Sequence, residues 1–386
     1  MTPGARVAAA IEILDQVQDG MPVEQGLTRW ARRSRFAGSK DRAAVRDLVF
    51  GVMRAKRSAA HFGRGETGRA LLIGFLHQQD APLEALFDGQ GHAPAPLSAA
   101  ERDFPAPEMH RGLAWNLPDW LIGPVEESLG EDAERTAMAL TERAPVTLRV
   151  NTVKASLTEA MAVLADEGIE TRQNPLAKTA LTVLAGDRKI RNSKPYLSGF
   201  IELQDAASQA VVAALPRGGR VLDFCAGGGG KALAMAGDLE RVIFAHDANP
   251  GRMADLPDRA ARAGAQIQVL TSAELAGQCP FDTILCDAPC SGSGAWRRAP
   301  EGKWRLTPAQ LADLHQTQDA ILDAALPLLA PGGTLAYATC SFLRSENEDR
   351  REAFLQRHPA FQCTFERRFA VSAEGDGFYT AHFRGE

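Results

Sequence analysis

The stretch VLDFCAGGGGK, residues 221–231, contains an apolar run, four consecutive glycines and the start of a helical pattern. The apolar run predicts a buried β-strand, and the glycines predict a turn where the backbone can approach a ligand closely. The helix that follows presents free N–H groups at its first turn. We therefore expect an α/β fold with a ligand site at this turn, formed by Cys225, Ala226, Gly227, Gly228, Gly229, Gly230 and Lys231.

The C-terminal half of the chain continues this alternation of strand and helix. Helical patterns cover residues 250–263 and 308–329, and strand-like runs lie near 220–224, 242–246, 267–270, 281–287 and 334–338. Such alternation predicts a doubly wound, mostly parallel sheet of the Rossmann-like type. Ligands of these sheets bind at the carboxyl ends of the strands.

Two further regions precede this sheet. About the first 60 residues have a helical period, and the stretch from His77 to Pro107 is rich in Pro, Gly and Ala with weak periodicity, which predicts a linker or a loosely packed arm. Residues 141–200 contain short β-rich runs on either side of a helix at 157–167. We expect three domains: a helical one with its linker over residues 1–140, a small α+β one over 141–200 and the Rossmann-like one over 201–386.

The composition is that of a globular protein, with 45% hydrophobic and 24% charged residues. No apolar stretch is long enough to cross a membrane, and residues 1–20 carry charges that a signal peptide lacks. The six cysteines all follow residue 224 and form no Cys-x-x-Cys pair, which favours reduced thiols over disulfides or a zinc site. We expect a cytoplasmic monomer without a metal ion.

The net charge of −5 is unevenly distributed. Residues 1–70 hold 13 Lys or Arg and 7 Asp or Glu, so this segment is +6 and the rest of the chain is −11. A basic cluster surrounds a turn at residues 37–39 and favours a nucleic-acid partner, although a solvated helix face explains the charge equally well. Its members are Arg29, Arg32, Arg33, Arg35, Lys40 and Arg42.

The glycine loop leaves the class of ligand open. A phosphate-binding loop requires a glycine where Cys225 stands and a hydroxyl where Ala232 stands, so that pattern fails twice. Gly227, Gly229 and Ala232 satisfy the dinucleotide pattern, and Asp247 follows at the end of the next strand. S-adenosylmethionine also requires a glycine loop and an acidic residue that binds ribose. A tight turn without a ligand, and Asp247 as a helix N-cap, are the alternatives without function.

Two cysteine motifs follow apolar strands, Asp287-Ala288-Pro289-Cys290-Ser291-Gly292 and Tyr337-Ala338-Thr339-Cys340-Ser341. Methylation of carbon 5 of cytosine requires a thiolate that adds to carbon 6, an acid that hydrogen-bonds the ring, and help with elimination. Cys340, Asp287 and Cys290 supply these groups. Each cysteine alone also fits a buried small hydrophobe, but a hydride-transfer enzyme would leave both unexplained.

At these residues the chain resembles the Sun family of RNA cytosine-5 methyltransferases that modify small-subunit ribosomal RNA. The resemblance covers nearly the whole chain, including Leu148–Asn151, Gln204–Ser208, Thr339–Asn347 and Gly375–Phe378. It implies a helical RNA-binding domain related to the antitermination factor NusB, a small domain like the RNA recognition motif, and S-adenosylmethionine as cofactor.

The resemblance also implies a role for each site residue. Cys340 would be the nucleophile, Cys290 would promote product release, and Asp287 would lie between cofactor and base. Lys231 and its loop would hold the methionine end of the cofactor, and Asp247 the ribose.

This sequence departs from the family pattern in its cofactor loop. Gly227, Gly228 and Ala232 replace the usual Ala, Pro and Thr, and Ser272 stands where an aspartate is usual. Ser272 can still accept a hydrogen bond from adenine or ribose, but without charge, so we expect lower cofactor affinity. An rRNA-binding assembly factor without activity is therefore the alternative. Four more residues are candidates for contact with RNA, and a solvated surface explains them nearly as well: Arg297, Arg298, Lys303 and Trp304.

Overall fold

The computed structural model describes residues 1–106 and 110–385, which form two compact units. Unit 1 comprises residues 1–126, 130–143 and 296–305, and unit 2 comprises 127–129, 144–295 and 306–386. The units separate close to the predicted boundary at residue 140, but the segment 296–305 belongs to unit 1. The division into three domains stays a proposal, because the two C-terminal regions lie together in unit 2.

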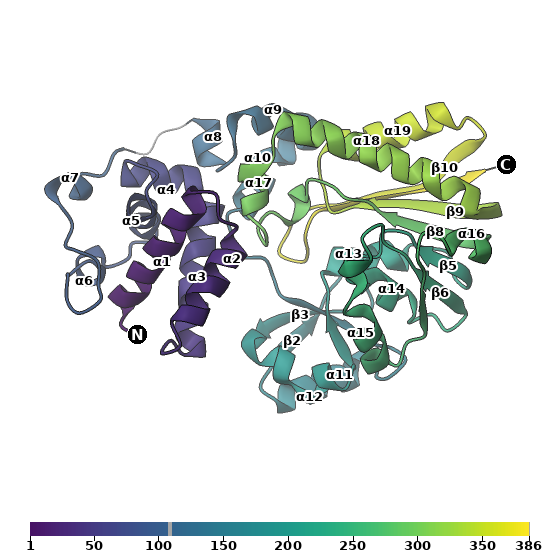
Figure 1. The fold of residues 1–386 in the computed structure, drawn as a ribbon, viewed down its shortest axis with the longest axis horizontal. Helices are drawn as coiled ribbons and strands as arrows, with labels where there is room; N and C mark the ends of the chain where they lie inside the picture. Colours follow the sequence, from purple (N-terminus) through teal and green to yellow (C-terminus); the bar gives the residue numbers. More distant parts are fainter. Residues whose placement is uncertain (107–109, 386) are drawn as a thin grey trace. The chain divides into compact units, whose positions relative to one another are not determined.

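Unit 1 is helical. Its main helices are α1 (Pro3–Gln18), α2 (Val23–Arg33), α3 (Ser39–Arg54), α4 (Lys56–Gly63) and α5 (Gly68–Gln78), coloured purple to blue in Figure 1. Shorter helices are α6 (Leu83–Leu86), α7 (Ala99–Arg102), α8 (Arg111–Ala114), α10 (Ala133–Ala139) and α17 (Glu301–Arg305), and α9 (Asp119–Leu129) ends in unit 2. The apolar faces of α1 and α3 meet in the core, where Ile13 and Val45 are fully buried. Phe87 is also fully buried there, so the described part of the predicted linker is packed and not a loose arm.

The first part of unit 2 is a four-stranded antiparallel sheet in the order β2-β3-β1-β4. Its strands are β1 (Thr147–Val150), β2 (Glu170–Gln173), β3 (Ala180–Ala185) and β4 (Ile201–Leu203), with α11 (Leu157–Asp166) and α12 (Lys194–Leu197). Ser156 and Glu159 form a capping box that starts α11, the helix expected at 157–167. β2 and β4 were not predicted, since neither run is distinctly apolar.

The second part of unit 2 is a seven-stranded sheet in the order β10-β11-β9-β8-β5-β6-β7. The strands from β5 to β9 pair in parallel, and β11 pairs antiparallel with both β9 and β10. The predicted doubly wound sheet is therefore confirmed. Its strands are β5 (Gly219–Asp223), β6 (Arg241–Ala245), β7 (Ile267–Val269), β8 (Phe281–Asp287), β9 (Leu329–Thr339), β10 (Phe361–Phe369) and β11 (Phe378–Gly385).

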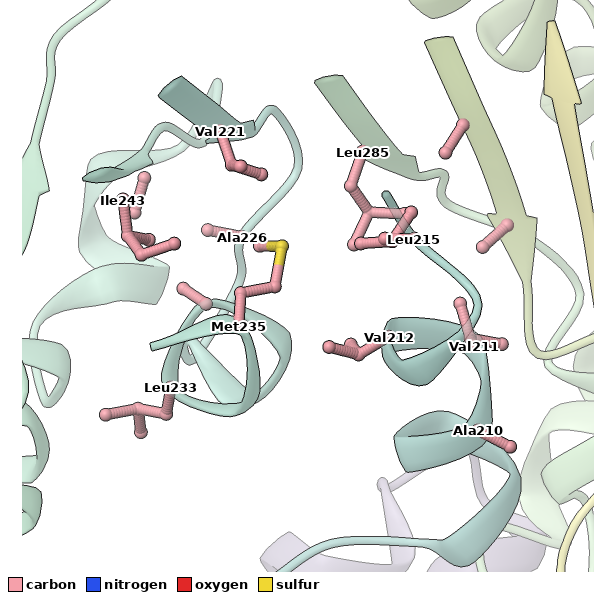
Figure 2. Close-up of a cluster of buried hydrophobic side chains, with 14 of the residues drawn as sticks. Ala210, Val211, Val212, Leu215, Val221, Ala226, Leu233, Met235, Ile243 and Leu285 are labelled. Atoms are coloured by element: carbon pink, nitrogen blue, oxygen red, sulfur yellow. The ribbon is translucent and has the colours of Figure 1, made fainter. Parts of the chain in front are cut away.

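Helices cover both faces of this sheet (Figure 1). Successive residues of β5 point to opposite faces, so Val221 packs in one hydrophobic cluster and Leu222 in the other. The first cluster contains α13 (Ala206–Ala213), α14 (Gly230–Met235) and α15 (Leu256–Ala263); the second contains α16 (Leu275–Gln278), α18 (Pro308–Ala325) and α19 (Glu348–Arg357). In Figure 2, Ala226 of the glycine loop lies among the side chains of the first cluster, which anchors the loop to the core. No helix of the described chain is long and apolar enough to cross a membrane.

Candidate active site

The predicted site residues of unit 2 gather at one edge of the seven-stranded sheet. The strands β5, β6, β8 and β9 are parallel, so the segments that follow them emerge on the same side. A cavity of about 620 Å³ opens there, and the glycine loop and both cysteine motifs line it. Its lining residues are Gln204, Ser208, Cys225, Ala226, Gly227, Gly228, Gly230, Lys231, Arg252, Asp287, Ala288, Pro289, Cys290 and Cys340.

The glycine loop has a backbone that only glycine adopts easily. Gly227 and Gly229 have φ angles of +52° and +76°, in the left-handed region. A Cβ atom at Gly229 would lie 2.3 Å from Cδ1 of Leu256, so this glycine is also required for packing. Gly229 therefore shapes the turn, whereas Gly227, Gly228 and Gly230 face the cavity.

Asp247 follows β6 as predicted, but other groups already bind its carboxylate. Oδ2 accepts hydrogen bonds from the backbone N–H of Gly227 at 2.9 Å and from Nη1 of Arg252 at 3.1 Å, and Oδ1 accepts from the N–H of Asn249. Arg252 lines the cavity and Asp247 is only 4% exposed. A ribose could reach this carboxylate only after the guanidinium moves.

Ser272 lies beside His246, a residue that the sequence did not point to. Nδ1 of His246 donates to the carbonyl oxygen of Phe224, which can only accept, and Nε2 lies 2.9 Å from Oγ of Ser272. The serine hydroxyl is exposed, and it is not among the described residues that line the cavity. The buried imidazole of His246 therefore positions the Ser272 hydroxyl.

Lys231 and Asp287 form an ion pair across the cavity, with Nζ 2.6 Å from Oδ2. Burial alone would lower the pKa of Lys231, but the charge of Asp287 and this hydrogen bond raise it, so the lysine stays charged. Asp223 lies behind them at the end of β5, where burial and the charge of Asp287 raise its pKa to about 7. The Lys231 cation is thus paired with Asp287 and lies near Asp223, whereas Asp247 is paired with Arg252.

The two motif cysteines lie next to each other in the cavity. Sγ of Cys290 lies 3.4 Å from Sγ of Cys340, within the range of a hydrogen bond between thiols. This contact and burial raise the pKa of Cys290 well above that of an ordinary thiol. Cys225 also lines the cavity, but burial and the charge of Asp223 raise its pKa. The pair 290 and 340 is therefore the arrangement in the cavity suited to thiol chemistry.

Glu346 joins the two cysteine loops, and sequence reasoning missed it. Its carboxylate is fully buried and accepts hydrogen bonds from the N–H of Ser291 at 2.7 Å, from Oγ of Ser291 at 2.5 Å and from Nε2 of Gln318 at 3.1 Å. Its carbonyl oxygen accepts from Oη of Tyr337, on the strand that leads to Cys340. The only sequence signal was its place within the family-like stretch Thr339–Asn347.

The expectation that residues 297–304 contact RNA is wrong for two of its four members. Lys303 is fully buried in unit 1 and Arg297 is only 3% exposed. Nζ of Lys303 donates to the carbonyl oxygen of Arg54 at 2.9 Å, and Nε1 of Trp304 donates to that of Met53. These side chains anchor the segment to α3, since the last carbonyls of a helix need donors. Arg298 is exposed and Trp304 is half-buried.

Over residues 1–106 and 110–385, no three His, Cys, Asp or Glu side chains lie close enough together to hold a metal ion.

Two family models match the chain: 16S rRNA methyltransferase RsmB/F over residues 210–384, and the RsmF/B-like ferredoxin-like domain over 117–188. The ribosomal RNA small subunit methyltransferase B of Citrobacter koseri is 34% identical over 355 residues, which cover 88% of this chain and 77% of that protein. The chain belongs to the RsmB/F family. The protein of the same description from Salmonella typhi is 34% identical over 282 residues, which cover 68% of this chain but 65% of that protein.

Solved structures confirm the Rossmann-like methyltransferase fold of this RsmB/F family member. The crystal structure of PH0851 superposes with a TM-score of 0.80 at 22% identity and covers 99% of both chains. The structure of NSun6 from Pyrococcus horikoshii with SFG gives a TM-score of 0.61 at 19% identity, over 69% of this chain and 98% of that one. The relation of unit 1 to NusB stays a prediction.

Proposed function

We propose that this chain transfers a methyl group from S-adenosylmethionine to carbon 5 of a cytosine in RNA, with small-subunit rRNA as the substrate. Membership of the RsmB/F family supports the reaction class and the methyl donor. One observation carries the finer assignment: two thiols lie 3.4 Å apart in the same cavity as the glycine loop. We also propose RNA as the sole partner of a monomer that acts in the cytoplasm.

The residues that line the cavity, together with Asp247 and Ser272 on the segments after β6 and β7, fit the proposed cofactor. Asp247 supplies a carboxylate acceptor for ribose hydroxyls, and the loop from Cys225 to Lys231 supplies N–H groups and a cation for a carboxylate. The cofactor would contribute an electrophilic methyl group on a sulfonium. Ser272, oriented by His246, supplies a neutral acceptor where the family pattern has a charged one.

The protein side of the reaction requires three groups. The Cys340 sulfur adds to carbon 6 of the cytosine, which breaks the aromatic system and makes carbon 5 nucleophilic. As the adduct forms, the ring nitrogen takes up a proton from water. The Asp287 carboxylate accepts hydrogen bonds from this N–H and from the amino group, and Lys231 holds the carboxylate in place. After methylation, the proton on carbon 5 passes to water, its electron pair forms the double bond between carbons 5 and 6, and the carbon–sulfur bond breaks to return the Cys340 thiolate. The ring nitrogen then gives its proton back to water.

Cys290 acts in the release step, after the methyl group has been transferred. The contact with Cys340 and burial raise the pKa of Cys290 well above that of an ordinary thiol, so Cys290 can hold a proton 3.4 Å from the Cys340 sulfur. A proton held next to the departing sulfur favours release of Cys340 from the methylated base.

Replacement of Cys290 by alanine tests this division of roles. We expect Cys290→Ala to methylate its RNA but to accumulate a covalent protein–RNA adduct, seen as a slow band on a denaturing gel with labelled rRNA and S-adenosylmethionine. Cys340→Ala should give neither adduct nor product, and Cys363→Ser, which lies outside the cavity, should behave like the unaltered protein. Normal turnover by Cys290→Ala without an adduct would show that the roles are assigned wrongly.

The second candidate is an rRNA-binding assembly factor without activity, favoured by Gly227, Gly228, Ala232 and Ser272 at positions where the family has other residues. The two candidates differ in one measurement, the transfer of a labelled methyl group to total rRNA. RNA binding without transfer would favour the assembly factor.

A further inference from the structure

Phe36 is the most exposed aromatic side chain that the structure describes. It is 78% exposed, and it is the one aromatic among the large apolar side chains that stand out from the described surface. It lies in the short loop between α2 and α3, at the centre of the basic cluster. Exposure of so large an apolar ring costs free energy in water, which a partner that covers the ring would recover.

Five cations flank Phe36 in the sequence and have no carboxylate partner in the described chain. Residues 29–42 hold six Lys or Arg and one Asp, a net charge of +5. In the chain as described, Arg33 is paired with Glu12, but no ion pair involves the side chains of the other five: Arg29, Arg32, Arg35, Lys40 and Arg42. All five are exposed.

Three other arginines of unit 1 each have a carboxylate partner. Arg46 is paired with Glu24, Arg64 with Asp103 and Arg69 with Glu101. The one acid of the cluster, Asp41, is itself bound by the N-terminal amine and by Arg6, so it does not offset the five cations. The positive charge is therefore concentrated around Phe36 and available to an anionic partner.

We propose that the surface formed by Phe36 and these five cations binds an unpaired RNA strand, with the Phe36 ring stacked on one of its bases. Single-stranded nucleic acid combines a phosphate backbone, which the cations attract, with bases whose faces stack on aromatic rings. A duplex offers the same phosphates but keeps its bases stacked internally. The inference rests on the proposed function for the choice of RNA as partner, and it adds that the RNA is unpaired where it meets unit 1.

Binding of a short fluorescein-labelled RNA without self-complementarity, followed by anisotropy with the full chain, tests the inference. Phe36→Ala should weaken binding about fivefold to a hundredfold, the usual effect of losing one stacked base, while Phe36→Tyr should retain it. Binding of the same sequence as a duplex should change little. Leu239→Ala is the matched control, since that apolar side chain is 79% exposed but lies in unit 2.

The cations are tested by the dependence of binding on salt. Arg35→Ala should lower the slope of log K against log salt by about 0.7, the value for one phosphate contact on a single strand. Arg46→Ala should leave the slope unchanged, because Arg46 is already paired. Phe36→Trp adds a direct readout, since stacking on a base should quench the extra tryptophan fluorescence. Because Phe36 is exposed, we expect thermal unfolding of every Phe36 variant to match that of the unaltered chain.

The proposal would be overturned if Phe36→Ala bound the RNA as tightly as the unaltered chain does, or if Phe36→Ala weakened binding of duplex and single strand equally. Displacement of the RNA by polyglutamate at equal charge would also overturn it, because it would indicate an acidic protein as the partner. Failure of the proposed function looks different. In that case the RNA binds through Phe36 but no labelled methyl group is transferred to it.

Discussion

At the scale of single residues, access of the cofactor to Asp247 depends on the groups that already bind this carboxylate. Asp247 is the expected ribose ligand, yet Arg252 covers it through an ion pair in which the arginine is 54% exposed and the aspartate 4%. A half-exposed pair of this kind contributes only about 0.2 to 1 kcal/mol. The guanidinium can therefore be displaced at small cost.

Replacement of Arg252 by methionine tests this reading. Since the cofactor no longer has to displace the ion pair, we expect S-adenosylmethionine to bind up to about fivefold more tightly, measured by calorimetry. Asp247→Asn serves as the control and should weaken binding, because the amide accepts fewer hydrogen bonds from the ribose. Weaker binding by Arg252→Met would indicate that the arginine holds the cofactor directly.

At the scale of elements, the separation of the two thiols depends on how the loop after β8 meets the loop after β9. Glu346 provides that contact, with three donors on its buried carboxylate. In Glu346→Gln the amide oxygen can still accept from the N–H of Ser291 and from Gln318, but the amide nitrogen faces Oγ of Ser291, whose hydroxyl must turn round to accept. The strong bond between that hydroxyl and a charged carboxylate is lost, so the contact between the two loops weakens.

We expect Glu346→Gln to lower kcat for methyl transfer about tenfold to a hundredfold with little change in KM for RNA, as a small displacement of a nucleophile does. Affinity for a trivalent arsenical, which binds two adjacent thiols, should fall in parallel and would report the separation directly. The control is Glu348→Gln, because Glu348 pairs with Arg368 and neither residue lines the cavity. An unchanged arsenical affinity with reduced kcat would contradict a positioning role.

At the scale of the whole molecule, the chain does not visit its two units in simple order. After the first cysteine motif it leaves unit 2, contributes residues 296–305 to unit 1, and returns. The buried side chain of Lys303 holds the segment 296–305 in unit 1. Burial and the nearby charge of Arg54 lower the pKa of Lys303 to about 7. Its Nζ still donates to the carbonyl oxygen of Arg54.

This lysine predicts how stability depends on pH. Between pH 7 and the ordinary lysine pKa of 10.5, the unfolded chain binds a proton at Lys303 that the folded chain does not, so the free energy of unfolding should rise with pH. The contribution is about 1.4 kcal/mol per pH unit, and Lys303→Met should remove it in chemical denaturation above pH 7. Lys56→Met, at a half-buried lysine of the same unit, should leave the slope unchanged. Equal slopes for Lys303→Met and the unaltered chain would contradict the lowered pKa.

Local patterns were sufficient for the parallel sheet. β8 begins and ends where its apolar run predicted, and β5 and β6 are displaced by one residue. β11 was missed because its buried run includes the polar residues Thr380 and His382. β10 was missed because it alternates exposed polar residues with half-buried ones and pairs only with β11, antiparallel to it. A strand at the edge of a sheet carries a weak apolar signal.

The sequence by itself determined the fold class, the edge of the sheet where the site lies and the presence of two thiols there, because hydrophobic period, glycine turns and strand ends are local properties. Only the tertiary structure decided that Arg252 covers Asp247, that Glu346 sets the distance between the thiols and that Lys303 is buried rather than exposed to RNA. Each of these depends on a side chain that meets a partner from another element or turn. No single stretch of sequence encodes such a contact, since it exists only once the elements have packed.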